Sequence, residues 1–244
     1  MIFRLIFRLD YPISYQLLDS MGKISDSIQT VFDQLGEMQK KVDLEVANRK
    51  ISASCLQQDE KGLKFVVELQ SMHGTFDFKN GVNTLELRKF FGVRIIHEVI
   101  ERLGLESLRY FNRFGIRCLY LVEGSKFTFE SINKHVLKQG EILSKSLTSC
   151  GFQQEDSMIT IIGTKNINGL RVSYGPYKKN EAQIHFALYP QVEQGLMMDI
   201  DLYATNLQAQ NIDFKSKLEL YLTEIDNIAK SIIDNLEGEL DVND

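Results

Sequence analysis

The stretch LRYFNRFGIRCLYLV, residues 108–122, decides the fold, because its apolar and basic residues alternate with the period of a β-strand. One face of this strand is expected to carry Arg109, Phe111, Arg113, Gly115 and Arg117, and the other Tyr110, Asn112, Phe114, Ile116 and Cys118. A guanidinium has five N–H donors and stays charged, so a row of three must meet carboxylates, phosphates or water.

The residues before this strand predict further strands and helices. Residues 2–9 alternate like a strand, and apolar positions then recur at helical spacing from Ile13 to about Met38. Residues 42–56 and 63–78, joined by the polar turn QQDEKG, predict a long antiparallel hairpin. Thr84 is the expected N-cap of a helix that ends near Leu103 and Gly104.

The residues after the arginine-rich strand predict a helix, four strands and a last helix. The first helix runs from Phe129 to about Leu147, with Leu143 and Leu147 facing inward. The four strands are expected at Met158–Gly163, Leu170–Tyr174, Ala182–Tyr189 and Leu196–Tyr203. The last helix, about Asp213 to Leu236, has the clearest amphipathic pattern in the chain.

Runs of helices and runs of strands without strict βαβ alternation indicate an α+β fold. We expect antiparallel sheets flanked by helices, with a long amphipathic C-terminal helix. Two sub-lobes are predicted: an N-terminal α+β lobe at 1–124 and a helix–meander–helix lobe at 125–236, followed by an acidic tail at 237–244. One continuous domain is the alternative, because no Pro/Ser-rich linker separates the halves.

Composition and charge limit the classes of function. A 43% hydrophobic and 25% charged content is typical of a globular protein, and the longest apolar runs fall short of the roughly 18 residues needed to cross a bilayer. Cys55, Cys118 and Cys150 are odd in number and widely spaced, which favours reduced core thiols and a cytoplasmic location.

The net charge of −5 comes from the C-terminus. Five acidic residues and no basic residue lie in the last stretch, and the rest of the chain is neutral; they are Asp234, Glu237, Glu239, Asp241 and Asp244. A neutral body argues against strong non-specific nucleic-acid binding, which depends on neutralising phosphates. A local basic groove is the alternative that this charge balance does not exclude.

A second motif, LMMDIDLY at residues 196–203, places Asp199 and Asp201 on one face of a predicted strand. Carboxylates about 7 Å apart along a strand can hold Mg²⁺. Acids on the wetter face of an ordinary strand are the simpler interpretation. If this strand and the arginine-rich strand share a sheet, their charges can instead pair across it. Two further interpretations of the arginines are a phosphate or nucleic-acid site and a protein interface.

Familiar catalytic and cofactor-binding motifs are absent from the sequence. It contains no H-E-x-x-H, C-x-x-C, G-x-S-x-G or Gly-rich phosphate-binding loop. We therefore expect no catalytic residue, no bound metal and no cofactor.

The pattern R-Y-F-N-R-F-G-I-R-x-x-Y-L, followed some eighty residues later by L-M-M-D-I-D-L-Y, resembles an uncharacterised, sporadically distributed family of bacterial proteins. Members carry an R-x-G-x-R strand and a late D-x-D strand. The chain departs from the family at Cys118 to Tyr120, where an aromatic residue and an asparagine are expected. The resemblance implies an accessory component of bacterial gene neighbourhoods, some linked to phage defence. Its characteristic positions would be Arg113, Gly115, Arg117, Asp199 and Asp201.

Three hypotheses of function follow. The first is a non-catalytic interaction or regulatory subunit that assembles with itself or with an effector ATPase or nuclease, with no membrane partner. The second is a nucleic-acid-binding protein that uses Arg109, Arg113 and Arg117. The third is a Mg²⁺-dependent phosphodiesterase or nuclease that uses Asp199 and Asp201.

Overall fold

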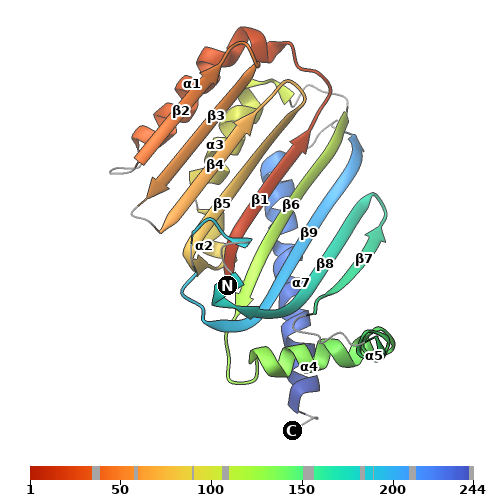
Figure 1. Ribbon diagram of the computed structural model, residues 1–244. Helices are drawn as coiled ribbons and strands as arrows, with labels where there is room; N and C mark the ends of the chain where they lie inside the picture. The colour runs from red at the N-terminus through yellow and green to blue at the C-terminus, as the bar shows by residue number, and fades with distance from the viewer. Residues whose placement is uncertain are drawn as a thin grey trace.

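The computed structural model describes residues 1–34, 39–57, 60–89, 91–105, 110–150, 157–181, 185–188, 190–208 and 213–241. Its centre is a nine-stranded antiparallel sheet in the order β2-β3-β4-β5-β1-β6-β9-β8-β7 (Figure 1). The predicted α+β class, with helices flanking an antiparallel sheet, is confirmed.

The elements have the following bounds. The strands are β1 (Ile2–Asp10), β2 (Gln39–Glu45), β3 (Lys50–Gln57), β4 (Lys61–Val67), β5 (Ser71–Val82), β6 (Tyr110–Val122), β7 (Ile159–Lys165), β8 (Asn168–Lys178) and β9 (Gln194–Gln208). The helices are α1 (Gln16–Asp33), α2 (Thr84–Arg88), α3 (Phe91–Arg102), α4 (Phe129–Gln139), α5 (Glu141–Ser149) and α7 (Phe214–Asp241), with a short 3-10 helix at Lys179–Glu181.

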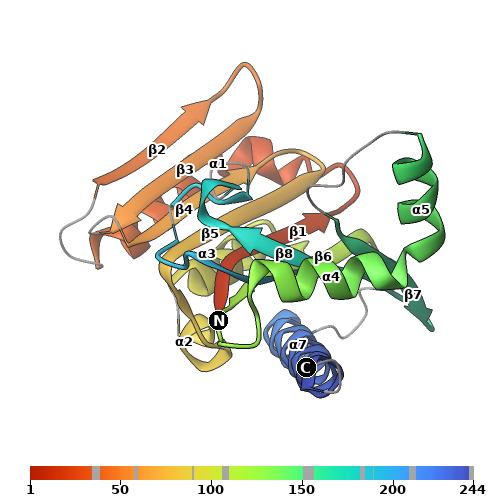
Figure 2. The ribbon, with the colours of Figure 1, turned by 60° about the horizontal axis from the view of Figure 1, so that its bottom comes forward.

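Helices cover one face of the sheet. In Figure 1, α1, α3 and α7 lie behind the strands, while the described residues between β8 and β9 lie on the face toward the viewer, near its lower end. Figure 2 shows α4 and α5 beside the lower end of the sheet. We call the face away from α1, α3 and α7 the open face.

The core lies between the sheet and α7, α1 and α3. The predicted stripe of the last helix is confirmed, because Leu218, Leu222 and Ile225 are buried. Aromatic rings tie α7 to β6: the ring centroids of Phe114 and Tyr221 lie 5.2 Å apart, edge to face. Burial of these large side chains is the main favourable contribution to folding.

The arginine-rich strand departs from strict alternation at its start. Phe111 was expected on the arginine face, but its ring packs on Phe214 of α7 with a centroid distance of 5.0 Å. Phe114 contacts the same ring. In β9, Asn206 adopts a positive φ of 52° between the paired residues Thr205 and Leu207. The ladder has no pair at the level of Asn112 and Asn206, and the same register continues on both sides. The change in alternation in β6 falls at this interruption.

Two further predictions about the N-terminal half were wrong in detail. The expected hairpin is a four-stranded meander, β2 to β5, because a turn near Arg49, with a φ of 52°, interrupts the predicted strand 42–56. The N-cap of α2 is Asn83 rather than Thr84. The Asn83 carboxamide oxygen accepts from the backbone N–H of Glu86, whose carboxylate accepts from the backbone N–H of Asn83.

The C-terminal half also differs from expectation. The helix predicted from Phe129 divides at Gly140 into α4 and α5. Of the expected strand Ala182–Tyr189, the described residues 185–188 are not extended in a strand. The last helix continues to Asp241, so the first part of the expected acidic tail is helical.

Strands from both sides of the predicted boundary near residue 124 are neighbours in the sheet. β6 pairs with β1 on one side and with β9 on the other. The segments 1–124 and 125–236 therefore contribute to one sheet. Within the described ranges, no helix is long and apolar enough to cross a membrane.

Candidate functional site

The arginines of β6 meet the aspartates of β9 on the open face. Arg117 and Asp201 are direct partners in the ladder, but each arginine bonds diagonally. Arg117 donates through Nε and Nη2 to the two carboxylate oxygens of Asp199, at 2.7 and 2.6 Å. Arg113 donates through Nη2 to Asp201 at 3.1 Å. The cross-strand pairing considered from the sequence is thus present in the structure.

The two carboxylates are mostly shielded from water. The exposed fractions of the Asp199 and Asp201 side chains are 16% and 20%, against 44% for Arg117. Burial raises the pKa of Asp201, although Arg113 and Arg117 oppose that shift. The hydrogen bonds to Asp199 raise the pKa of Arg117, which favours the charged guanidinium.

Gly115 makes room for an aromatic side chain beside these ion pairs. It lies directly opposite Tyr203, and a Cβ at position 115 would approach the Tyr203 Cβ to 2.9 Å. On the other side of Tyr203, a Cβ at Gly169 would overlap the phenol ring. The guanidinium of Arg113 lies 4.3 Å from the centroid of the same ring. The glycine in the R-x-G-x-R pattern therefore serves packing.

The open face carries three further arginines, of which two are paired. On β1, Arg4 donates to Asp77 at 2.6 Å and Arg8 donates to Asp10 at 2.9 Å. Arg171 of β8 stands opposite Asp201 in the ladder and is exposed, and it makes no ion pair with the described residues. The sequence reasoning missed these arginines as site residues. The alternation of Arg4 and Arg8 in residues 2–9 was the signal that could have found them.

The arrangement leaves little room for metal chemistry at Asp199 and Asp201, because arginine N–H groups occupy their carboxylates. Across the described ranges, no three His, Cys, Asp or Glu side chains gather closely enough to hold a metal ion. Arg109, the first of the three predicted arginines, lies outside the described residues.

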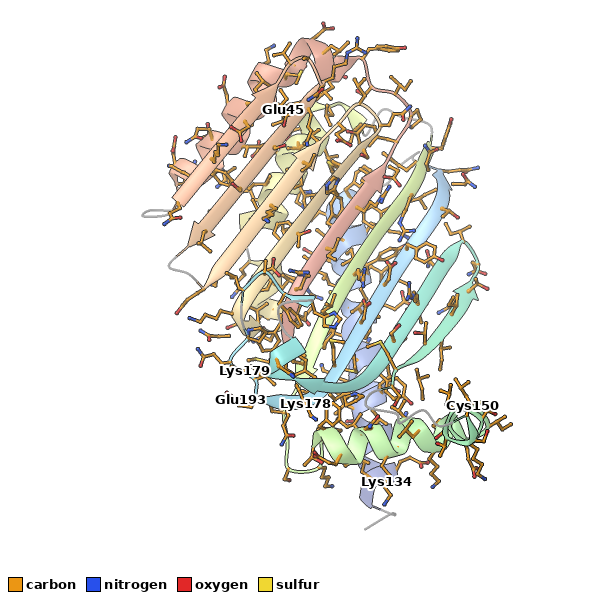
Figure 3. All side chains as sticks on the ribbon, viewed as in Figure 1. Glu45, Lys134, Cys150, Lys178, Lys179 and Glu193 are labelled. Atoms are coloured by element: carbon orange, nitrogen blue, oxygen red, sulfur yellow. The ribbon has the colours of Figure 1, made fainter. Side chains whose placement is uncertain are left out.

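The cysteines only partly follow the expectation of core thiols. Cys55 and Cys118 are buried, and burial raises the pKa of both thiols. Cys150 is exposed at the C-terminal end of α5, so its assignment to the core was wrong (Figure 3).

A second surface on the molecule is apolar and was not predicted. Helix α5 has no buried residue, and Ile142 and Leu143 are 86% and 65% exposed, so the inward orientation expected for Leu143 was wrong. The edge strand β7 adds Ile161, which is 61% exposed and lines the same groove as Leu143, and Ile162, which is 70% exposed and lies on the opposite face of the sheet. The run Ile159 to Ile162 signalled a strand, but its place at the edge depends on the strand order. We call these four side chains, with strand β7 itself, the β7 edge.

Comparison of the chain with protein-family models and with curated proteins finds no match in either.

Proposed function

We propose that the protein is a non-catalytic interaction subunit that assembles first with a second copy of itself through the β7 edge. The observation that carries this proposal is the contrast between the two ends of the sheet. An edge strand presents unpaired N–H and C=O groups, and proteins commonly protect such strands with charged side chains.

The β2 edge is protected in this way and the β7 edge is not. Strand β2 carries Lys40, Lys41, Asp43 and Glu45 within seven residues (Figure 3 shows Glu45 at its end). Strand β7, ITIIGTK, has Lys165 as its single charged residue, at its last position. The unprotected edge is therefore the one suited to pairing with another strand.

A two-fold axis suits this strand. Antiparallel pairing of β7 with its own copy is self-complementary, as a two-fold interface requires. If Ile162 faces its counterpart across the axis, Lys165 lies opposite Ile159 of the partner subunit. The two lysines are then at opposite ends of the pairing, and no like charges meet. Helix α5 would bring Ile142 and Leu143 to the apolar part of the interface.

The ion pairs of the open face support a non-catalytic role. The carboxylates that a nuclease would use for Mg²⁺ are engaged by Arg113 and Arg117, and those arginines are correspondingly less available to nucleic-acid phosphates. An effector ATPase or nuclease of a bacterial defence system remains the expected further partner, on the family resemblance alone.

Sedimentation velocity of the full chain over a range of concentrations tests self-assembly. We expect a concentration-dependent dimer that Ile162→Lys converts to a monomer. Leu44→Lys is the matched control, because Leu44 is an exposed leucine on the opposite edge strand, and this variant should still dimerise. A wild-type chain that stays monomeric, or equal loss of the dimer in both folded variants, would contradict the proposal.

A further inference from the structure

A pocket of about 400 Å³ lies on the open face, away from the arginine–aspartate pairs of β6 and β9. Strands β2, β3 and β4 form its floor, and residues Ala187 and Leu188 form one wall. In Figure 1 the described residues between β8 and β9 lie near the lower ends of β4 and β5. The volume is within the range of small-molecule sites in proteins.

Lysine and hydroxyl side chains alternate in one row across the pocket floor. Lys41 of β2 is the ladder partner of Ser54, and Ser54 is the partner of Lys64 on β4. Neighbouring strands lie about 4.8 Å apart, so the Lys41 and Lys64 backbones are roughly 10 Å apart with Ser54 between them. Two flexible four-carbon side chains can close that distance and bring both ammonium groups to one anion above the serine hydroxyl.

The pocket has an excess of positive charge. Its one lining carboxylate, Asp77, is already bonded to Arg4, and its third lysine, Lys40, is bonded to Asp33. Lys41 contacts Asp43, but their side chains are 70% and 45% exposed, so that pair contributes little. Lys64 makes no ion pair with the described residues. The charge without an ion pair therefore falls on Lys64, and Lys41, on the other side of Ser54, is held only by its exposed pair with Asp43.

We propose that this pocket binds a small phosphate-bearing molecule. The phosphoryl group would lie between the ammonium groups of Lys41 and Lys64 and accept a hydrogen bond from the Ser54 hydroxyl. The remainder of the molecule would contact Leu56 and Leu188, which supply apolar surface in the same pocket. This site is independent of the self-assembly proposed above, because β7 is at the opposite end of the sheet.

A small ligand fits the charge distribution better than a nucleic-acid strand. A bound strand needs a track of uncompensated cations, whereas Arg4, Arg8, Arg113 and Arg117 on the neighbouring strands are each paired with an aspartate. Arg171 of β8 makes no ion pair with the described residues, but β5, β1, β6 and β9 separate it from the pocket strands. The unpaired cations therefore do not form one continuous track.

Pyrophosphate titration of the full chain, followed by amide chemical shifts, tests the site. We expect saturable shifts centred on Ser54 and Lys64, at least a tenfold loss of affinity in Lys64→Ala and a smaller loss in Ser54→Ala. Lys50→Ala is the control, because Lys50 is on β3 beside Glu45 and does not line the pocket. It should bind pyrophosphate like the wild type.

Three outcomes would overturn the proposal. They are shifts that do not saturate, equal weakening by Lys50→Ala and Lys64→Ala, and tighter binding of a single-stranded oligonucleotide with a steep salt dependence. The folded Ile162→Lys variant should bind pyrophosphate normally, so failure of self-assembly and failure of this site can be distinguished.

Discussion

Arg117 forms its two-pronged hydrogen bond with Asp199, although the residue directly opposite it in the ladder is Asp201. Because Arg117 bonds to Asp199, the Asp201 carboxylate accepts its hydrogen bond from Arg113, four residues earlier in β6. Two arginines and two aspartates thus pair off across β6 and β9. The four charges neutralise one another, and the two ion pairs help to align the neighbouring strands β6 and β9.

A double-mutant cycle on Arg117→Ala and Asp199→Ala should give a coupling free energy of about 1 kcal/mol. Partial exposure of Arg117 limits the value, while the two short hydrogen bonds raise it above that of an ordinary surface pair. Chemical unfolding measures the coupling. The same cycle on Lys41 and Asp43, which are more exposed, should give less than about 0.5 kcal/mol. Equal couplings for the two pairs would contradict a special role for Arg117 and Asp199.

Substituting Arg113→Leu should raise the pKa of Asp201 further, because Arg113 is the largest influence that opposes the burial of this carboxyl group. Carbon-13 NMR titration of the carboxyl group measures the change. Arg171→Leu is the control, since Arg171 faces Asp201 in the ladder but is not among the groups that shift its pKa. A larger shift in Arg171→Leu than in Arg113→Leu would be inconsistent with the observed pairing.

The raised pKa of Asp201 also has a defined effect on folding. Because the folded state binds this proton more tightly than the unfolded state, the contribution of Asp201 to stability is greatest below pH 3.8 and is lost as the pH rises through the folded-state pKa. Asp201→Asn removes that dependence. Urea unfolding measures the free energy of unfolding of the wild type and of the variant across this pH range. The wild-type value minus the variant value should decrease as the pH rises, and an increase would refute the assignment.

Gly115→Ala should destabilise the protein by about 1–3 kcal/mol, because the new methyl group meets the Cβ of Tyr203 across paired backbones that cannot easily separate. Gly22→Ala on α1 is the control, since no atom lies within 4 Å of a Cβ there and Gly22 is far from β7. It should be neutral or slightly stabilising. Thermal unfolding compares the two, and similar melting temperatures would mean that the fit between Gly115 and Tyr203 is unimportant.

Tyr221→Phe should weaken the fold by about 1 kcal/mol near neutral pH, because the Tyr221 hydroxyl donates to Asn168 Oδ1 at 2.8 Å. Burial, and then Glu224, raise the pKa of Tyr221 to about 12. The stability that this hydroxyl contributes is complete below pH 10 and is lost as the pH rises toward 12. The difference in unfolding free energy between the wild type and Tyr221→Phe, measured by chemical unfolding, should therefore become smaller over that range. A difference that grows with pH would contradict this account of the Tyr221 hydroxyl.

Local patterns were sufficient to predict the central strands and the last helix. Alternation with period two identified β6 and β9, and their complementary charges suggested the pairing now seen between Arg117 and Asp199. The helical period identified α7 and its buried stripe. In these elements, the side chains that face the core are regular enough for the sequence alone to reveal them.

Features that depend on strand order or register could not be predicted. The edge position of β7, and so the exposure of Ile162, follows from pairings between segments distant in the chain. The row Lys41–Ser54–Lys64 exists only in the register of three adjacent strands. The reversal of Phe111 falls where the ladder between β6 and β9 is interrupted, opposite Asn206, which is almost a hundred residues away in the chain. The local spacing of apolar and polar residues contains no information about which distant strands pair or in which register.

Amide hydrogen exchange of the full chain at low and high protein concentration tests the central claim, self-assembly through β7, most directly. If the chain assembles in this way, amides of β7 become more protected as the concentration rises, while those of the charged edge strand β2 exchange at the same rate at both concentrations. Unchanged exchange in β7, or equal protection of β2 and β7, would contradict it.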